Sequence, residues 1–249
     1  MRMTGAEMVV KTLEKNGVKV VFGYPGAANC PIIDKLSFSS IKHILTRNEQ
    51  GAAHMASGYA RVTKQAGVCT ATSGPGATNL ITGIATAYMD SIPMVALTGQ
   101  VATKLIGKDA FQEVDITGAT LPFTKHSYLI KDGLDIPRVV HEAFHIANTG
   151  RPGPVLIDFP MDLLKKEFDY PDEDEDVNIR GYKLMGKANE SQVKKVAEAI
   201  KDAKKPVILA GGGVVISDAT NEFRKFVKET DIPVVSTMMG IGILPSDNP

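Results

Sequence analysis

The sequence has no tryptophan, only two cysteines and no net charge, and these shortages exclude several classes of protein. Its 28 basic side chains balance its 28 acidic ones, so no overall field recruits nucleic acid or an anionic membrane surface. The longest nearly apolar run, 206–216, is far shorter than the roughly 18 residues that span a bilayer. Cys30 and Cys69 form no paired motif and the first residues contain no apolar leader, which suits a reducing cytoplasm. We expect two buried or inert thiols, no membrane span and no nucleic-acid partner.

The order of strand-like and helix-like segments indicates an α/β fold. Short β-branched runs alternate with amphipathic stretches, which predicts a six-stranded parallel sheet covered by helices on both faces. Thr4 and Glu7 form a capping box that opens a first helix ending near residues 16–17. The further elements expected in this part are strands at 18–22, 43–45, 68–72, 94–98, 128–130 and 155–159, and helices at 49–63, 77–89 and 136–148.

The chain divides into a complete domain, a linker and the start of a second domain. Six strands complete a domain over residues 1–166, and an acidic stretch without apolar periodicity, 167–189, reads as a solvated linker or, alternatively, a functional acidic tail. Residues 190–249 predict a second, incomplete α/β domain, so we expect a fragment of a longer protein. Its expected elements are a helix at 190–203, a strand at 206–210, a helix at 218–230 and a strand at 233–236.

Three strand-to-helix junctions are rich in glycine and proline: Gly23–Ala27, Ser73–Asn79 and Thr98–Gln100. In a parallel sheet these junctions share the carboxyl edge, where backbone N–H groups and small residues let a ligand approach. Each junction alone is equally consistent with a tight turn. Their convergence at one edge favours a ligand site.

Glu49 begins the helix after the second strand of the sheet. Ala52, Ala56 and Ala60 form a stripe that lets a backbone or a flat ligand approach this helix. Glu49 directly follows an apolar strand, so we expect it to be partly buried. From the residues alone, the simpler interpretation is a first-turn carboxylate that complements the helix dipole.

Two other motifs predict no site. His141–His145 matches the HExxH zinc pattern, but the apolar stripe of its helix places His141, Glu142 and His145 on the opposite, solvated face, so no metal is expected. The glycine run 210–214 lacks the third glycine of a dinucleotide loop, and a plain turn explains it at least as well.

Several motifs together resemble one family, the thiamine-diphosphate-dependent enzymes of the acetolactate synthase (acetohydroxyacid synthase) large-subunit type. The resemblance covers essentially the whole chain, and the Phe111–Glu113 segment is the part most specific to the acetolactate synthase type. The motifs that carry it are Phe22–Gly26, Asn48–His54, Gly58–Arg61, Ser73–Asn79, Leu97–Val101, Asp109–Glu113 and Gly150–Val155.

The resemblance implies that the complete protein condenses pyruvate with a second 2-oxo acid, pyruvate or 2-oxobutyrate, with loss of CO2 through a thiamine diphosphate ylide. This reaction serves branched-chain amino acid synthesis or acetoin-forming catabolism. The alternatives are another thiamine-dependent 2-oxo acid decarboxylase or lyase, and a non-catalytic nucleotide-binding domain that kept the fold. The carboxylate at Glu49 argues against the last, because a domain without proton chemistry has no need of it.

The resemblance also assigns roles to residues of a pyrimidine-binding domain. Glu49 matches the catalytic residue that hydrogen-bonds N1′ of the aminopyrimidine, where a shared proton favours the imino tautomer. The other implied contacts are with the cofactor for Tyr24, Pro25, Gly26, Gly76 and Asn79, with substrate for Phe111 and Gln112, and with a non-redox FAD for Arg151.

Three positions depart from the family pattern. Ala27 stands where a second glycine is usual, Asn48 where a histidine is common, and Met161 where a lysine is common. The lost lysine leaves the choice of substrate open, whereas the role of Glu49 is unaffected.

The family binds the diphosphate and Mg2+ through a Gly-Asp-Gly motif of a C-terminal domain, and the nearest sequence here is Lys131–Leu134. Because that domain belongs to another subunit, the resemblance implies a homodimer, with a small regulatory subunit as a further possible partner. We expect the chain alone to be inactive and to bind thiamine diphosphate weakly.

Overall fold

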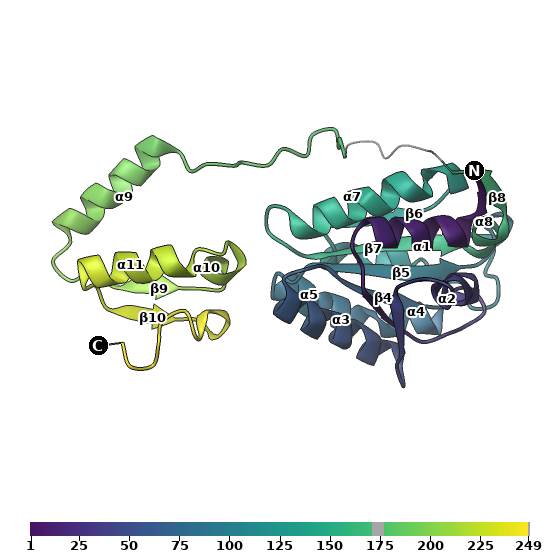
Figure 1. Cartoon of the computed structure of the whole chain (residues 1–249), viewed down its shortest axis with the longest axis horizontal. Helices are drawn as coiled ribbons and strands as arrows, with labels where there is room; N and C mark the ends of the chain where they lie inside the picture. The colour runs from purple at the N-terminus through teal and green to yellow at the C-terminus, as the bar shows by residue number, and fades with distance from the viewer. Residues whose placement is uncertain (171–176, 249) are drawn as a thin grey trace. The chain divides into compact units, whose positions relative to one another are not determined.

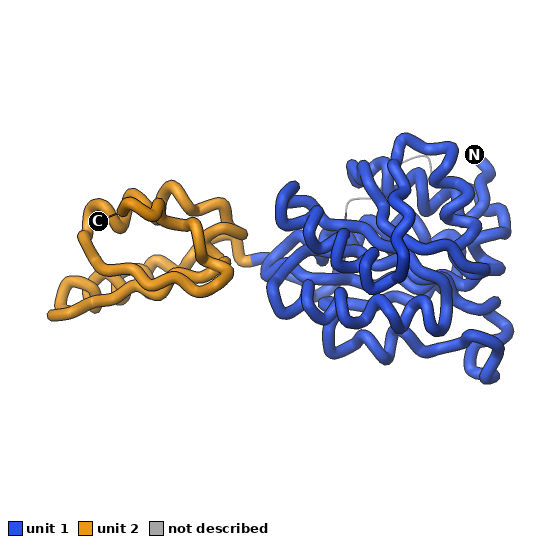
Figure 2. Tube along the Cα trace, turned by 90° about the horizontal axis from the view of Figure 1, so that it is seen from below, with its two compact units in different colours: residues 1–184 blue, residues 185–249 orange. Residues whose placement is uncertain are grey.

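The computed structural model describes residues 1–170 and 177–248 and divides the chain into two units, 1–184 and 185–249 (Figure 2). The acidic residues between 171 and 176, which the sequence assigns to a linker, lie outside the described residues. Each unit is described by itself below.

Unit 1 contains the six-stranded parallel sheet that the sequence predicts. Its strand order is β3-β2-β4-β5-β7-β6, so the chain crosses over between β2 and β4 and again between β5 and β7. Every neighbouring pair is parallel, which places all six carboxyl ends at one edge. The strands are β2 (Val20–Gly23), β3 (Lys42–Leu45), β4 (Gly67–Ala71), β5 (Met94–Gln100), β6 (His126–Leu129) and β7 (Pro154–Pro160).

Helices cover both faces of this sheet, as expected. Helices α1 and α7 lie over one face and α3 and α5 over the other (Figure 1). The helices of unit 1 are α1 (Gly5–Lys15), α2 (Cys30–Leu36), α3 (Glu49–Thr63), α4 (Pro75–Asn79), α5 (Ile81–Met89), α6 (Ile116–Thr120), α7 (Ile136–Asn148) and α8 (Met161–Lys165).

Local signals account for several helix boundaries. The capping box at the start of α1 is present: Thr4 Oγ1 accepts from the Glu7 N–H at 3.3 Å, and Glu7 accepts from the Thr4 N–H at 2.8 Å. Helices α3 and α7 have the predicted limits. The single helix expected over 77–89 is instead two, α4 and α5, which meet at Leu80.

The beginning of the expected linker belongs to the folded unit. Residues Glu167–Asp169 form strand β8, which pairs antiparallel with β1 (Arg2–Thr4). Phe168 and Tyr170 are buried in the main core, and Lys11 lies 4.3 Å from the centre of the Tyr170 ring. The prediction of a solvated stretch is therefore wrong here, because two alternate aromatic side chains point inward.

The segment before residue 185 is also attached to unit 1. The Tyr182 hydroxyl lies 2.8 Å from Thr149 Oγ1 and 3.3 Å from Lys125 Nζ. Lys125 in turn donates to the Ile146 and Thr149 carbonyls at the end of α7. These contacts fix a tyrosine of the expected linker on the end of a helix.

The two cysteines lie in different environments. Cys69 is buried in β4, and this burial raises the pKa of its thiol to about 12. Cys30 is exposed at the start of α2, so of the two thiols expected to be buried or inert only Cys69 is buried.

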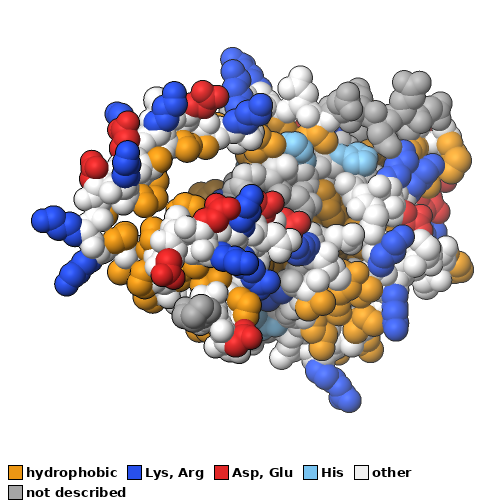
Figure 3. Space-filling model, turned by 60° about the vertical axis from the view of Figure 1, so that its left-hand side comes forward, with side chains coloured by type: hydrophobic (Ala, Val, Ile, Leu, Met, Phe, Trp, Pro, Cys, Tyr) orange, Lys and Arg blue, Asp and Glu red, His pale blue; other side chains and the backbone are white. Residues whose placement is uncertain are grey.

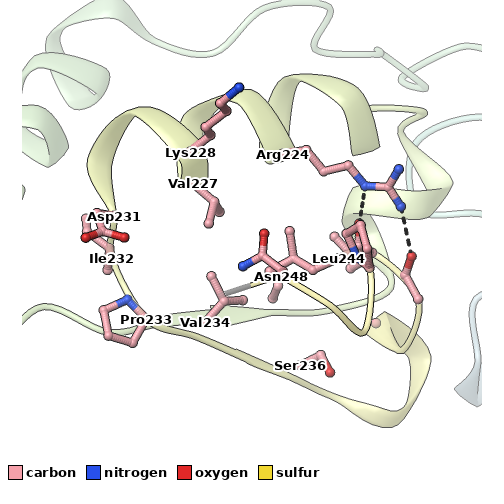
Figure 4. A pocket seen from close by; sticks show the side chains of 15 residues that line it. Arg224, Val227, Lys228, Asp231, Ile232, Pro233, Val234, Ser236, Leu244 and Asn248 are labelled. Carbon is pink, nitrogen blue, oxygen red and sulfur yellow. Dashed lines mark hydrogen bonds between the residues drawn. The ribbon is translucent and has the colours of Figure 1, made fainter.

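Unit 2 is a smaller α/β arrangement in which β9 and β10 pair in parallel. Between α11 and β10 lies a cavity of about 710 Å³, beside which the Arg224 guanidinium donates to the Ile243 carbonyl at 2.6 Å (Figure 4). Hydrophobic side chains lie at the surface of this unit among its charged ones (Figure 3). Its elements are α9 (Glu190–Asp202), β9 (Ile208–Ala210), α10 (Gly213–Ile216), α11 (Thr220–Thr230) and β10 (Val234–Ser236).

Short 3-10 helices complete the description: Thr103–Leu105, Leu121–Phe123, Gly133–Asp135 and Met238–Gly240. Among the described residues, no helix combines the length and the apolar character needed to cross a bilayer.

Candidate functional site

The three glycine-rich junctions meet at the carboxyl edge of the sheet. A methyl group at Gly26 would fall 2.5 Å from Thr72 Cβ, and one at Gly99 would fall 2.5 Å from the Ala28 carbonyl carbon. The loop after β2 is therefore in direct contact with the loop after β4 and with the carboxyl end of β5. The expected convergence of these junctions is confirmed, and glycine is needed at both contacts, against the Thr72 side chain and against the Ala28 backbone.

Glu49 lies at this edge, at the amino end of α3. The Asn48 side chain caps the helix by accepting from the Gly51 N–H at 2.7 Å, and the Asn48 carbonyl accepts from Thr46 Oγ1 at 2.8 Å. These contacts fix the turn between β3 and α3. Glu49 is consequently buried, with 9% of its surface exposed.

One oxygen of Glu49 is engaged by a neighbouring loop and the other faces a glycine. Oε2 accepts from Asn79 Nδ2 at 3.0 Å. A methyl group at Gly76 would lie 3.2 Å from Oε1, so glycine leaves free the space in front of that oxygen. The structure thus brings together three of the predicted residues, Glu49, Gly76 and Asn79.

The loop after β2 carries the remaining residues predicted to line the cofactor. The Tyr24 N–H donates to the Thr70 carbonyl at 3.4 Å, and the Tyr24 ring is partly exposed. Pro25 and Gly26 follow at the same edge, where the Gly26 N–H donates to Asn29 Oδ1 at 2.7 Å. This loop approaches the loop that carries Gly76 through Thr72, which lies against both Gly26 and Gly76.

Sequence reasoning missed two residues that hold these loops. Asn29 is fully buried and its Nδ2 donates to the Tyr24 carbonyl at 3.2 Å and to Thr70 Oγ1 at 3.3 Å. Thr72 lies between Gly26 and Gly76 and accepts from the Ala28 N–H at 3.1 Å. The only local signal was their position next to a glycine-rich motif.

Phe111 and Gln112 lie on the long loop between β5 and α6. Phe111 is 87% exposed. Gln112 has a left-handed backbone with φ of +57°, and its carbonyl oxygen would lie 2.6 Å from a methyl group at Gly74. Gly74 itself has φ of +59°, so both the conformation and the contact require glycine there. This contact places Gln112 against the loop that carries Gly76.

Arg151 does not join these residues. It precedes β7 and therefore lies at the amino edge of the sheet, opposite the glycine-rich junctions. Its Nε donates to Ser91 Oγ at 2.7 Å, and its guanidinium carbon lies 5.8 Å from the centre of the Tyr88 ring. Its contact with a flavin stays a prediction.

The residues of the HExxH pattern are half-buried, so the prediction of a solvated face is wrong. His141 Nδ1 lies 3.0 Å from Asn16 Nδ2, and Glu142 accepts from the Tyr128 hydroxyl at 2.8 Å. Burial and the Glu142 carboxylate raise the pKa of Tyr128. Among residues 1–170 and 177–248, the structure contains no cluster of three or more His, Cys, Asp or Glu side chains that could hold a metal ion.

Two protein-family models match the chain, and the first of them covers the buried glutamate and the glycine-rich loops. A family described as "Thiamine pyrophosphate enzyme, N-terminal TPP binding domain" matches residues 3–119, and "Thiamine pyrophosphate enzyme, central domain" matches residues 193–249. The chain therefore belongs to the thiamine pyrophosphate enzymes.

Within this class the chain is similar to acetolactate synthases. Over 99% of its length it is 54% identical to the probable acetolactate synthase large subunit of Methanocaldococcus jannaschii, of which it covers 42%. It is 51% identical to the acetolactate synthase of Mycobacterium leprae and 49% identical to the acetolactate synthase large subunit of Corynebacterium glutamicum, and covers 40% of each. The chain thus spans less than half the length of these curated relatives.

Proposed function

We propose that this chain supplies the pyrimidine-binding side of an acetolactate synthase active site, which condenses pyruvate with a second 2-oxo acid and releases CO2. The observation that carries the proposal is the environment of Glu49, a buried carboxyl group with one oxygen held by Asn79 and the other facing Gly76. The similarity to acetolactate synthases supports the choice of reaction.

The residues at this edge fit an aminopyrimidine. Glu49 Oε1 offers a hydrogen-bonding atom, Gly76 keeps the space before it free, and the loop after β2 carries an aromatic side chain, Tyr24, whose ring is partly exposed. Thiamine diphosphate, when bound, supplies a carbon nucleophile and an electron sink for decarboxylation. We propose that Tyr24, Pro25, Gly26, Gly76 and Asn79 hold its pyrimidine ring.

The chemical task of this chain is proton sharing at the ring nitrogen N1′. Asn79 holds Oε2 and Oε1 faces Gly76, so Oε1 would be the oxygen available to N1′ of the cofactor. The amino end of α3, capped by Asn48, stabilises negative charge on Glu49. Burial limits the access of water to Glu49, so that with thiamine diphosphate bound its carboxyl group would share a proton with N1′ rather than with solvent.

Other parts of the proposal concern the complete protein. The diphosphate and Mg2+ are assigned to a C-terminal domain of a second subunit, so the enzyme is a homodimer, with a small subunit as regulator. FAD is assigned to the region of Arg151 and the second domain, and the compartment is the cytoplasm. Phe111 and Gln112 are assigned to the 2-oxo acid substrate. We propose that the first domain extends beyond residue 166 to include strand β8, and that the second domain occupies 190–249.

The test is Glu49→Gln in the complete protein, in which this chain is joined to the C-terminal domain that the family resemblance implies. We expect acetolactate formation from pyruvate to fall at least about a hundredfold, because glutamine cannot share a proton with N1′. Glu198→Gln, at an exposed position on α9, is the matched control and should retain full activity.

Circular dichroism and size-exclusion chromatography check that the Glu49→Gln protein is folded and dimeric. Retention of more than about a tenth of the activity would contradict the role of Glu49. Acetaldehyde in place of acetolactate as the wild-type product would assign the chain to a decarboxylase instead.

A further inference from the structure

Gln100 ends β5 at the carboxyl edge and ties together both ends of the following loop. Its side chain is buried, with 3% of the residue exposed. Oε1 accepts from the Val101 N–H at 2.9 Å, and Nε2 donates to the Val114 carbonyl at 2.8 Å and to Asp158 Oδ2 at 2.9 Å. Val101 and Val114 bound the loop that carries Gln112, so a single amide group closes that loop.

Asp158 fixes the orientation of this amide. It lies on β7 directly opposite Thr98, whose hydroxyl donates to Oδ1 at 2.7 Å, while Gln100 donates to Oδ2. Only 1% of Asp158 is exposed. Burial raises the pKa of its carboxyl group to about 7, helped by the charge of Asp115 and opposed by the two hydrogen bonds. An oxygen that accepts from Gln100 keeps Nε2 turned toward Asp158 and Val114.

The rest of the loop transmits this constraint to the candidate site. Glu113 accepts from the Ala110 N–H at 2.9 Å and from the Gly107 N–H, which folds the loop on itself. The Gln112 backbone then lies against Gly74, directly before α4. A shift at either end of the loop therefore moves Gln112 relative to the loop that contacts Glu49.

A separate contact fixes the first turn of the loop but not its far end. The Thr103 N–H and hydroxyl donate to Asp162 at 2.9 and 2.6 Å. These bonds lie near Val101, whereas Gln100 also reaches Val114. The Gln100 amide is thus the contact that joins the two ends.

We propose that Gln100, oriented by Asp158, is a positioning residue that holds the loop 101–114 with Gln112 against the glycine loop beside Glu49. Neither side chain needs to touch the reacting atoms. The loop geometry stands on the contacts above, whereas its consequence for 2-oxo acid binding rests on the proposed function.

Hydrogen exchange on this chain tests the positioning itself. Gln100→Asn keeps the amide but is one carbon shorter, so it cannot reach Val101, Val114 and Asp158 together. We expect amides of 105–113 to exchange at least about tenfold faster, while those of 94–99 in β5 keep their protection. Gln192→Asn, at an exposed position on α9, is the matched control and should change neither segment.

Two variants of Asp158 separate hydrogen bonding from packing. Asp158→Asn retains an oxygen that can accept from Gln100, so loop exchange should stay within about threefold of wild type. Asp158→Leu removes the acceptor and should resemble Gln100→Asn. Unchanged loop exchange in both Gln100→Asn and Asp158→Leu would overturn the proposal. An equal increase in the exchange rates of the loop amides and of the β5 amides would also overturn it, because Gln100 and Asp158 would then only stabilise the sheet.

Kinetics of the complete protein test the consequence for substrate. We expect Gln100→Asn to raise the KM for pyruvate about tenfold, while the thiamine diphosphate concentration for half-maximal activity stays within about twofold. Equal shifts in both constants would contradict a role specific to the substrate loop. If Glu49→Gln retained activity, the proposed function would fail, yet the exchange experiment would still decide whether Gln100 positions the loop.

Discussion

At the scale of single residues, Gly76 shows how closely the site is packed. A methyl group there would fall 2.7 Å from Thr72 Cγ2 and 3.2 Å from Glu49 Oε1. We expect Gly76→Ala to lower the free energy of unfolding of unit 1 by about 1–3 kcal/mol through overpacking. Urea denaturation of this chain measures the change without any cofactor.

Gly58 offers a matched control for that substitution. It lies at an exposed position inside α3, and a methyl group there would have no neighbour within 4 Å. Gly58→Ala should raise stability by about 0.5–1 kcal/mol, because alanine favours the helix. The same destabilisation for both substitutions would show that close packing at Gly76 is not the cause.

Asp158 predicts a pH dependence of stability. Burial raises the pKa of its carboxyl group from 3.8 to about 7 in the folded chain, so between these values the folded state holds a proton that the unfolded state releases. Its contribution to stability therefore falls as pH rises from about 4 to about 7, by up to about 1.4 kcal/mol per pH unit, and is constant above.

Asp158→Asn isolates this contribution, because other titrating groups are common to both proteins. Unfolding free energies measured by urea titration at several pH values give the difference, wild type minus variant. This difference should decrease between pH 4 and 7. A difference independent of pH would mean that Asp158 ionises normally in the folded chain.

Residues such as Asn29 show why part of the site was not predictable. Asn29 stands directly before α2 and reads locally as a helix cap, yet its side chain makes no capping bond. It binds instead the Tyr24 carbonyl and Thr70, a partner 41 positions away. The burial of Glu49, by contrast, was predictable from the sequence, because this residue directly follows an apolar strand at the start of a helix.

At the scale of elements, the hydrophobic periodicity of the sequence predicted the strands and helices whose positions depend on local sequence. All six strands of the sheet were expected within a few residues of their positions, and α3 and α7 have their predicted limits. Buried parallel strands read as continuous β-branched runs, and the two helices have clear apolar stripes.

The elements that were missed depend on distant partners. Strands β1 and β8 are short and exist through their pairing across the unit, which no local pattern shows. The division of 77–89 into α4 and α5 falls at Leu80, whose side chain is fully buried. Tertiary contact, rather than propensity, sets these boundaries.

At the scale of the whole chain, the two units differ in how much apolar surface they bury. Unit 1 has a continuous core that joins helices α1 and α7 to the sheet. In the described part of unit 2 the buried apolar side chains are Ala210, Val227, Ile232 and Ile243. Its exposed apolar side chains include Val193, Val196, Val207, Leu209 and Val235. A sheet of two strands with so little buried surface is marginally stable.

We therefore expect hydrogen exchange in this chain to separate the units, with amides of β9 and β10 exchanging at least about a hundredfold faster than those of β4 and β5. A matched pair of substitutions tests the cause. Leu97→Ala, at a fully buried position, should lower the stability of unit 1 by about 2–5 kcal/mol. Leu209→Ala, with its side chain 71% exposed, should change stability by less than about 0.5 kcal/mol. Comparable protection in the two sheets, or a large cost at Leu209, would mean that the surface of β9 is covered in solution.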